Sequence, residues 1–271
     1  MRLPRLCVFD LDGVLFRGET VIPEAPRCIE RLRSAGVAVA FLTNNSSQPR
    51  TVYVAKLTRL GMPCTEEEIV TSASISAWYL REETVGRGAT VFAVGGPGIR
   101  DEMERVGISV RSTVDPVERD HECDHVVVGL DREFRYETLL RAQQCILRGA
   151  RFIATNRDTQ YPTETGVIPG GGSIVAAVAA ASETEPTTVG KPERHGLDLL
   201  MARHALGPAD VVMVGDRPDT DILCANRCGV ASVLVLTGVT DREQAECAPT
   251  EMRPGRIVDT LDELWPDART A

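Results

Sequence analysis

Lysine is almost absent from this chain. Of its 30 lysine and arginine residues, only Lys56 and Lys191 are lysine. Arginine carries its charge on a planar fork, whereas lysine offers a compact ammonium that fits between closely spaced oxygens. Lys191 stands in a loop after an expected strand, and it is therefore a candidate for a site that needs a compact cation.

The sequence also lacks an apolar run near the length of about 18 residues that a membrane-spanning helix needs. Its eight cysteines form no CxxC pair, which disfavours a zinc ribbon or a thioredoxin-like redox motif. A strand is expected directly after the first five residues, with no apolar segment typical of a signal peptide. These absences predict a cytoplasmic protein with reduced thiols.

A basic surface is missing as well, because the formal net charge is −9. An acidic chain disfavours binding to nucleic acid or to an anionic membrane, so we expect neither as a partner. Any site for an anion must then be built from local groups. The 271 residues are enough for one large domain or two modest ones.

Short apolar runs alternate with helical patterns along the chain. The first series includes an apolar run at 37–42 and a helical pattern at 49–60. A second series includes the runs at 89–94 and 126–128 and the helical pattern at 136–147. This alternation predicts a parallel sheet covered by helices on both faces, which is a Rossmann-like doubly wound α/β fold.

Polar segments interrupt this pattern twice, at 84–88 and 182–186, and both are typical of linkers. The strands expected from 187–189 onward then resume the first series. We therefore predict a discontinuous core domain over residues 1–80 and 186–271, with an inserted α/β domain over residues 81–185.

Two aspartates, Asp10 and Asp12, follow the first apolar run of the chain. The run predicts a buried strand, so both carboxylates stand at its carboxyl end, where ligands bind in open α/β sheets. Two carboxylates at this spacing can reach one cation or one substrate atom, and a metal or a shared proton relieves their repulsion. This motif alone also fits a solvated acidic turn.

Three further strings stand at other expected strand ends. Thr43–Asn45 supplies a hydroxyl and backbone N–H groups that suit a phosphate, although the same residue types are common helix caps. Lys191 precedes a proline, and Asp216 ends another apolar run with Asp221 five residues further on. The clustering of acidic residues indicates a site for a hard cation.

Taken in order, the four strings resemble the motifs DxDGxx, (S/T)N, KP and GDxxxTD of the haloacid dehalogenase (HAD) superfamily. The resemblance covers the whole chain. Strings around Leu130, Asn156 and Thr237 are similar to the NagD-like and 4-nitrophenylphosphatase-like subfamily, which carries a large α/β cap. The resemblance implies a HAD core with an inserted cap, and a Mg²⁺-dependent phosphatase that hydrolyses small-molecule phosphate monoesters.

The resemblance also implies roles for the acidic residues. Asp10 would attack phosphorus to form an aspartyl phosphate, and Asp12 would serve as general acid and then as general base. Mg²⁺ would be held by Asp10, the backbone carbonyl of Asp12 and Asp216. Asp221 would orient Lys191 or a water molecule on the metal.

The phosphoryl oxygens would be held by Thr43, Lys191 and the backbone amides of Asn44 and Asn45. Selectivity among phosphorylated metabolites would come from the cap, which closes over such sites. The residues expected by resemblance to face the leaving group lie in one cap loop: Asn156, Arg157, Asp158 and Tyr161.

Further expectations concern assembly and alternatives. We expect a homodimer formed through the cap, and tight packing of the cap against the core at Gly170–Gly172. A phosphotransferase or phosphomutase of the same superfamily is one alternative, and product analysis separates it from a phosphatase. A phospho-receiver signalling domain is another, although receivers are shorter and lack an inserted domain.

Overall fold

Two parallel sheets, each with its own buried core, divide the chain into two units. The computed structural model describes residues 2–85, 88–163 and 166–265. We call residues 1–43, 51–70 and 191–271 unit 1, and residues 44–50 and 71–190 unit 2. Each unit is described by itself below.

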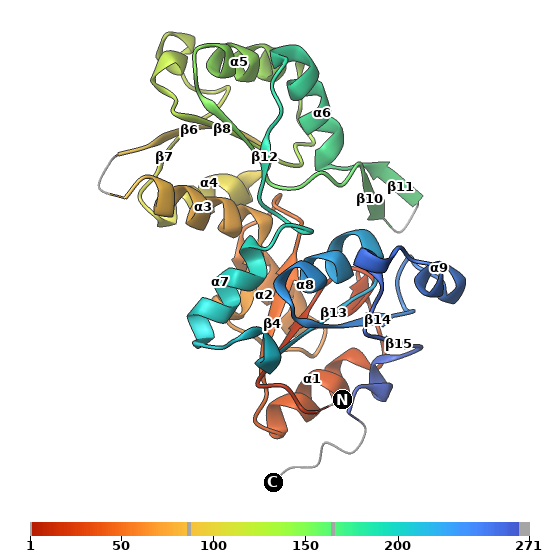
Figure 1. Ribbon diagram of the computed structural model, residues 1–271. Coiled ribbons are helices and arrows are strands. Elements are labelled where there is room, and N and C mark those ends of the chain that lie inside the picture. Colours follow the sequence, from red (N-terminus) through yellow and green to blue (C-terminus); the bar gives the residue numbers. More distant parts are fainter. Residues whose placement is uncertain (1, 86–87, 164–165, 266–271) are drawn as a thin grey trace. The chain divides into compact units, whose positions relative to one another are not determined.

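Unit 1 contains a six-stranded sheet in the order β15-β14-β13-β1-β4-β5 (Figure 1). Its strands are β1 (Leu6–Phe9), β4 (Ala38–Thr43), β5 (Ile69–Thr71), β13 (Val211–Gly215), β14 (Ala231–Val235) and β15 (Arg256–Val258). β1 runs parallel to both β4 and β13. From β1 the chain adds strands on one side, and from β13 it adds strands on the other. The order reverses between β1 and β13, and doubly wound sheets bind ligands at the carboxyl ends beside such a reversal.

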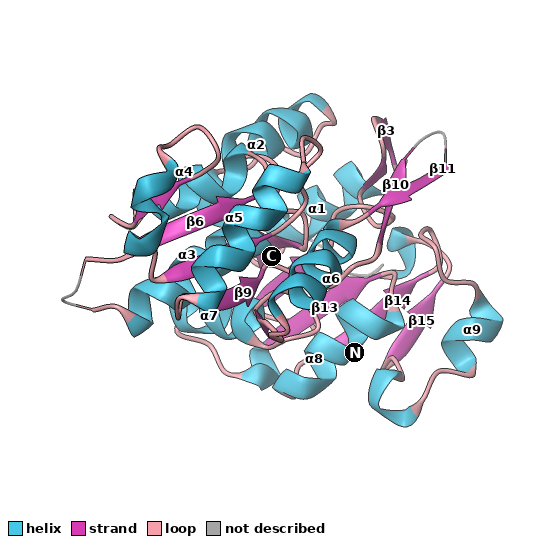
Figure 2. Ribbon diagram, turned by 90° about the horizontal axis from the view of Figure 1, so that it is seen from above, coloured by secondary structure: helices cyan, strands magenta, loops and turns pink. Residues whose placement is uncertain are grey.

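Helices flank the strands of unit 1, as Figure 2 shows in cyan and magenta. They are α1 (Ala25–Ser34), α2 (Arg50–Arg59), α7 (His195–His204), α8 (Leu223–Cys228) and α9 (Arg242–Glu246). Every residue of β1 is buried, as expected of a parallel strand that is covered on both faces. Cys7 and Phe9 belong to one apolar cluster with Ile29 and Leu32 of α1. A small hairpin follows β1 and consists of β2 (Phe16–Arg17) and β3 (Thr20–Val21).

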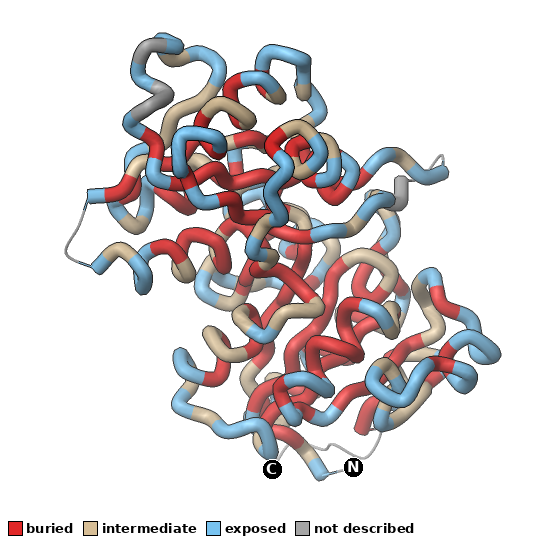
Figure 3. The backbone as a smooth tube through the Cα atoms, turned by 45° about the horizontal axis from the view of Figure 1, so that its top comes forward, coloured by how far each residue is buried: buried red, intermediate tan, exposed pale blue. Residues whose placement is uncertain are grey.

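Unit 2 contains a five-stranded parallel sheet in the order β12-β9-β8-β6-β7. Its strands are β6 (Thr90–Val94), β7 (Ser109–Arg111), β8 (His125–Val128), β9 (Arg151–Ala154) and β12 (Thr187–Thr188). Its helices are α3 (Ser72–Glu83), α4 (Pro97–Arg105), α5 (Tyr136–Leu147) and α6 (Gly171–Ser182). An antiparallel hairpin, β10 (Gln160–Thr163) and β11 (Gly166–Pro169), precedes α6. In Figure 3 red stretches of the tube, which mark buried residues, run through the interior of each unit.

The predicted doubly wound α/β fold is confirmed, and the helix expected at 136–147 is α5 with the same bounds. The strand expected at 187–189 lies elsewhere than predicted. Instead of resuming the first sheet, Thr187 and Thr188 pair with Ile153 and Ala154 at the edge of the unit 2 sheet. So short a strand carries too little pattern to reveal its partner, because pairing depends on which strand edge lies beside it in the fold.

The two units also differ in extent from the predicted core and inserted domain. Residues 44–50, 71–80 and 186–190 pack in unit 2 rather than with the core. Helix α3 accounts for much of this difference, because it packs against α4 of the same unit. The assignment of catalysis to unit 1 and of selectivity to unit 2 stays a prediction.

Candidate active site

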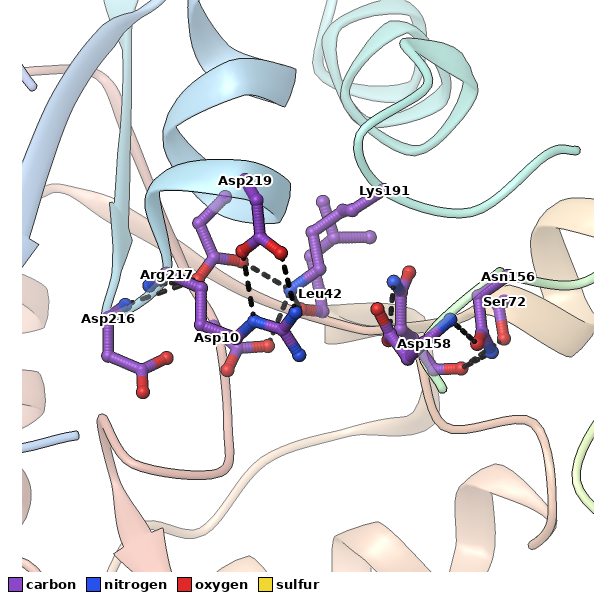
Figure 4. Close-up of polar contacts among 11 residues, drawn as sticks. Asp10, Leu42, Ser72, Asn156, Asp158, Lys191, Asp216, Arg217 and Asp219 are labelled. Atoms are coloured by element: carbon purple, nitrogen blue, oxygen red, sulfur yellow. Dashed lines mark hydrogen bonds and ion pairs between the residues drawn. The ribbon is translucent and has the colours of Figure 1, made fainter. Parts of the chain in front are cut away.

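Lys191 is the centre of a buried polar cluster at the carboxyl ends of the unit 1 strands. Its Nζ lies 2.5 Å from Oδ1 of Asp10, 2.7 Å from Oδ1 of Asp221 and 2.9 Å from the carbonyl oxygen of Leu42 (Figure 4). Three acceptors match the three N–H donors of an ammonium. The side chain is only 3% exposed, so the scarcity of lysine did point to a special environment.

Three carboxylates surround this single cation. Oxygens of Asp10, Asp216 and Asp221 lie within 4.8 Å of one another, and all three residues are buried. Burial and the neighbouring carboxylates raise the pKa of Asp10 well above its usual value, against the opposing charge of Lys191. Burial and the charge of Asp221 raise the pKa of Asp216 to about 7. A divalent cation would relieve this excess of negative charge.

The hydrogen bonds of the cluster show which oxygens such a cation could use. Asp221 has both oxygens engaged: Oδ1 accepts from Lys191, and Oδ2 accepts from the backbone N–H groups of Asp216 and Arg217, each at 3.1 Å. Oδ2 of Asp216 accepts from Val239 N at 2.9 Å. Within the described residues, no donor meets Oδ1 of Asp216 or Oδ2 of Asp10. The two oxygens suit a hard, oxygen-preferring cation such as Mg²⁺, and Asp221 is left as the residue that orients Lys191.

Asp12 stands in the loop after β1. The loop is held from two directions, because Gly13 N donates to Phe16 O at 2.8 Å and Thr237 Oγ1 donates to Gly13 O at 2.7 Å. Burial raises the pKa of Asp12 to about 6, while the charges of Lys56 and Lys191 act to lower it. A carboxyl group with a pKa in this range can both give and take a proton near neutral pH.

Lys56 has no role in the site predicted from the sequence. Its Nζ lies 3.8 Å from the ring centroid of Phe16 and 3.3 Å from Oε1 of Glu19, and its charge acts on Asp12. Both lysines of the chain therefore lie near the Asp10–Asp12 loop. The signal that could have found Lys56 is the one already used for Lys191, namely the rarity of lysine itself.

The string Thr43–Asn45 is divided between the two units. Thr43 is buried at the end of β4 in unit 1, whereas Asn44 and Asn45 pack in unit 2. Asn44 Nδ2 donates to Asp158 Oδ2 at 3.0 Å, and Asn45 Nδ2 donates to the Tyr161 hydroxyl at 3.1 Å. The residues predicted to bind phosphate and the loop predicted to read the leaving group are thus hydrogen-bonded to each other inside unit 2.

The cap loop residues have different surroundings. Asn156 is buried, donates to the carbonyl of Asn44 at 2.7 Å and accepts from Asp158 N at 3.0 Å. Arg157 is exposed and is bonded elsewhere, to Glu185 and Thr188. The structure therefore brings Asn156, Asp158 and Tyr161 to Asn44 and Asn45, and it does not bring the Arg157 side chain there.

The glycines at 170–172 pack inside unit 2 against this same loop. Gly172 N donates to Asp158 O at 2.9 Å. A side chain at Gly172 would collide with the carbonyl of Arg157. The glycines pack closely, but their contacts lie within unit 2 and not with the core as predicted. Sequence spacing could not reveal this partner.

Sequence profiles of two families match the chain. A profile described as haloacid dehalogenase-like hydrolase matches residues 7–109, and one described as HAD-hydrolase-like matches residues 188–264. The chain belongs to the haloacid dehalogenase superfamily. The resemblance drawn from the four strings is confirmed.

Relatives of known activity resemble this HAD protein over nearly all of its length. It is 37% identical to the glycerol-3-phosphate phosphatase of Gallus gallus, over 96% of this chain and 90% of the relative. The glycerol phosphate phosphatase of Mycobacterium tuberculosis, solved in complex with magnesium, has a TM-score of 0.87 and 34% identity, over 95% of this chain and 75% of that one. The 4-nitrophenylphosphatase of Thermotoga maritima has a TM-score of 0.89 and 29% identity, over 98% of each chain.

Gly238 offers a direct test of the cation site. A Cβ at this position would collide with Oδ2 of Asp216, so we expect Gly238→Ala to displace that carboxylate. Changes to groups that support metal ligands typically cost ~10–100-fold in metal affinity. Titration calorimetry should show weaker Mg²⁺ binding by a factor in this range.

The matched control is Gly207→Ala, where a Cβ would meet nothing within 4 Å and φ is −96°. It should bind Mg²⁺ like the wild type. Equal Mg²⁺ affinity in both variants would mean that Asp216 does not ligate the metal.

Proposed function

We propose that this HAD protein is a Mg²⁺-dependent phosphatase that hydrolyses phosphate monoesters of small metabolites. The observation that carries the proposal is the buried contact of Lys191 with Asp10 and Asp221 at the point where the strand order reverses. That contact occupies one oxygen of Asp10 and leaves the other without a donor among the described residues. The relatives of this protein that are named above are phosphatases, and this supports hydrolysis of a phosphate ester as its reaction.

In the first step, the carboxylate of Asp10 attacks phosphorus, and the bond from phosphorus to the leaving oxygen breaks. Asp12 gives its proton to that oxygen, so an alcohol departs and an aspartyl phosphate remains. Lys191 and Thr43 stabilise the negative charge that develops on the phosphoryl oxygens. The contact between Lys191 and Asp221 holds the ammonium in place during this step.

In the second step, Asp12 removes a proton from a water molecule that attacks phosphorus. The bond between phosphorus and Asp10 breaks, which releases inorganic phosphate and regenerates the carboxylate. Both steps use Asp12 in opposite protonation states, and its raised pKa of about 6 suits that exchange.

Mg²⁺ fits the donor set of this site. Asp10, Asp216 and the backbone carbonyl of Asp12 would hold it. When bound, it offsets the negative charge shared by Asp10 and the phosphoryl group. Asp221 would orient Lys191, because its Oδ1 accepts from that ammonium and its Oδ2 accepts from two backbone N–H groups.

We assign selectivity among metabolites to the loop of unit 2 that carries Asn156, Asp158 and Tyr161. The relatives' names include glycerol phosphate and 4-nitrophenyl phosphate activities, and these substrates share only the phosphoryl group. A panel of small phosphate esters assayed with Mg²⁺ would identify the preferred substrate by its kcat/KM.

Asp10→Asn tests the chemistry itself. The amide is isosteric with the carboxylate but is no nucleophile, so inorganic phosphate release from glycerol phosphate should fall below about 1% of wild type. The wild type should lose activity in EDTA and recover it with Mg²⁺. Turnover by Asp10→Asn well above that level would rule out covalent catalysis by this residue.

The Asp12→Asn variant distinguishes the proposed general-acid role of Asp12 from the nucleophilic role of Asp10. An alkoxide leaves only with a proton, whereas 4-nitrophenolate leaves unaided, and general acid assistance contributes ~10²–10⁴ where it is needed. Rapid-quench kinetics should therefore show a much larger first-step loss with glycerol phosphate than with 4-nitrophenyl phosphate. With the aryl ester, aspartyl phosphate should accumulate, because the second step lacks its base. Equal losses with both esters and no accumulation would leave Asp12 a merely structural role.

We also propose that the protein is cytoplasmic and forms a homodimer through unit 2. All eight cysteines are free thiols, which supports a reducing compartment, and no helix among the described residues could span a membrane. Helix α5 exposes Tyr136, Leu140 and Leu147, which recur on one face. Such an exposed apolar stripe supports a self-association surface.

The assembly proposal is tested by Leu147→Glu. A charge in the middle of an apolar interface is costly, so light scattering should find a dimer for the wild type and a monomer for this variant. Val52→Glu, at an exposed valine of α2 in unit 1, should leave the dimer intact. A monomeric wild type at micromolar concentration would contradict the proposal.

A further inference from the structure

Phe16 holds the loop that carries Asp12 from both sides. Its carbonyl oxygen accepts from Gly13 N at 2.8 Å, and its own N–H donates to the carbonyl of Leu11 at 3.4 Å. Asp12 itself forms a β-bridge with Phe16. The backbone of Phe16 therefore contacts both chain neighbours of Asp12, so the position of Phe16 sets the position of this loop.

The side chain of Phe16 contacts Lys56, which lies on helix α2 of the same unit. Phe16 is only 1% exposed, and Nζ of Lys56 lies over its ring, 3.8 Å from the centroid. An ammonium at this distance is attracted by the negative face of an aromatic ring. The Lys56 side chain is 20% exposed, so the contact is largely shielded from water. Lys56 thereby ties Phe16 to α2.

A second contact joins the same hairpin to α2. Glu19 lies between β2 and β3, and its Oε1 is 3.3 Å from Nζ of Lys56. Arg59, three residues after Lys56 and on the same face of the helix, donates to Oε2 of Glu19. Glu19 is 62% exposed, and ion pairs with such an exposed group contribute little. The contact with the buried ring of Phe16 thus distinguishes Lys56 from Arg59.

We propose that Lys56 is a positioning residue that holds Phe16, and through its backbone the Asp12 loop, where the loop must lie for proton transfer to the leaving oxygen. The inference rests on the proposed function, in which Asp12 is the general acid. Every contact that carries it lies within unit 1. The two lysines of the chain then serve the same strand end, because Lys191 contacts Asp10 and Lys56 acts on the loop that follows.

Lys56→Met tests the ring contact, because it keeps an unbranched apolar side chain and removes the ammonium. A well-placed acid matters only where the leaving oxygen needs a proton. In rapid-quench experiments, the first step with glycerol phosphate should slow by about 10-fold, which is less than the ~10²–10⁴ of complete general acid assistance. The first step with 4-nitrophenyl phosphate should be unchanged. Lys56→Arg keeps a cation that can stack on the ring and should restore the wild-type rate.

Arg59→Met is the matched control. It removes the other cation that binds Glu19 and leaves the contact between Lys56 and Phe16 in place. It should hydrolyse both esters like the wild type. A loss as large as that of Lys56→Met would assign the effect to the ion pairs with Glu19 and would overturn the role of the ring contact.

Phe16→Leu separates the contact from the charge of Lys56. It removes the aromatic ring and keeps both an apolar side chain and the ammonium. We expect the same selective loss with glycerol phosphate as in Lys56→Met. A normal first step in Phe16→Leu would mean that Lys56 acts on Asp12 through its charge alone, and the proposal would fail. Melting temperatures show whether Phe16→Leu folds; if it does not, the exchange experiment below decides the question.

Amide hydrogen exchange distinguishes this inference from the proposed function, because it needs no turnover. The Gly13 N–H, which is bonded to Phe16 O, should exchange several-fold faster in Lys56→Met, since a weaker local contact opens more often. It should exchange at the wild-type rate in Arg59→Met. Faster exchange in Lys56→Met of a protein that hydrolyses no ester would refute the proposed reaction and leave the hold of Lys56 on the loop standing. Unchanged exchange in Lys56→Met, with an active wild type, would refute the positioning role alone.

Discussion

The ammonium of Lys191 is the group on which the rest of the site depends. Taking an ammonium out of water costs several kcal/mol, and here three oxygens from Asp10, Asp221 and Leu42 offset that cost. Burial alone would lower the pKa of Lys191, but the two carboxylates raise it, so the side chain stays charged. Through this one cation, the ends of β1 and β4 and the turn after β13 are tied together.

The surroundings of Lys191 also explain why the site favours a divalent cation. Three carboxylates and one ammonium are buried together here, and burial and the neighbouring carboxylates raise the pKa of both Asp10 and Asp216. Asp221 uses Oδ1 to hold Lys191 and Oδ2 to hold two backbone N–H groups after β13. Asp10 and Asp216 each keep one oxygen without a donor among the described residues, and these oxygens could hold a divalent cation.

The chain passes from one compact unit to the other beside Thr43 and beside Lys191. Thr43 and Lys191 belong to unit 1, while the residues beside them in the chain, Asn44 and Gly190, belong to unit 2. In unit 1, Asp10 and Lys191 form an ion pair at the strand ends. In unit 2, the buried side chains of Ser72 and Asn156 donate to the carbonyl of Asn44.

The sequence by itself was enough to predict the fold class. It also revealed the acidic motifs, the lysine motif and the Thr43–Asn45 motif as candidate site residues. Apolar runs reveal parallel strands, and the strings stand directly at their ends. It did not determine the partner of β12, the place of Lys56, or the contacts of Ser72 and Asn156. Asn156 and Asn44 are 112 positions apart, and a hydrogen bond over that separation leaves no periodic or local trace in the sequence. Only the tertiary structure, which packs distant loops around one peptide group, decided which polar residues act together.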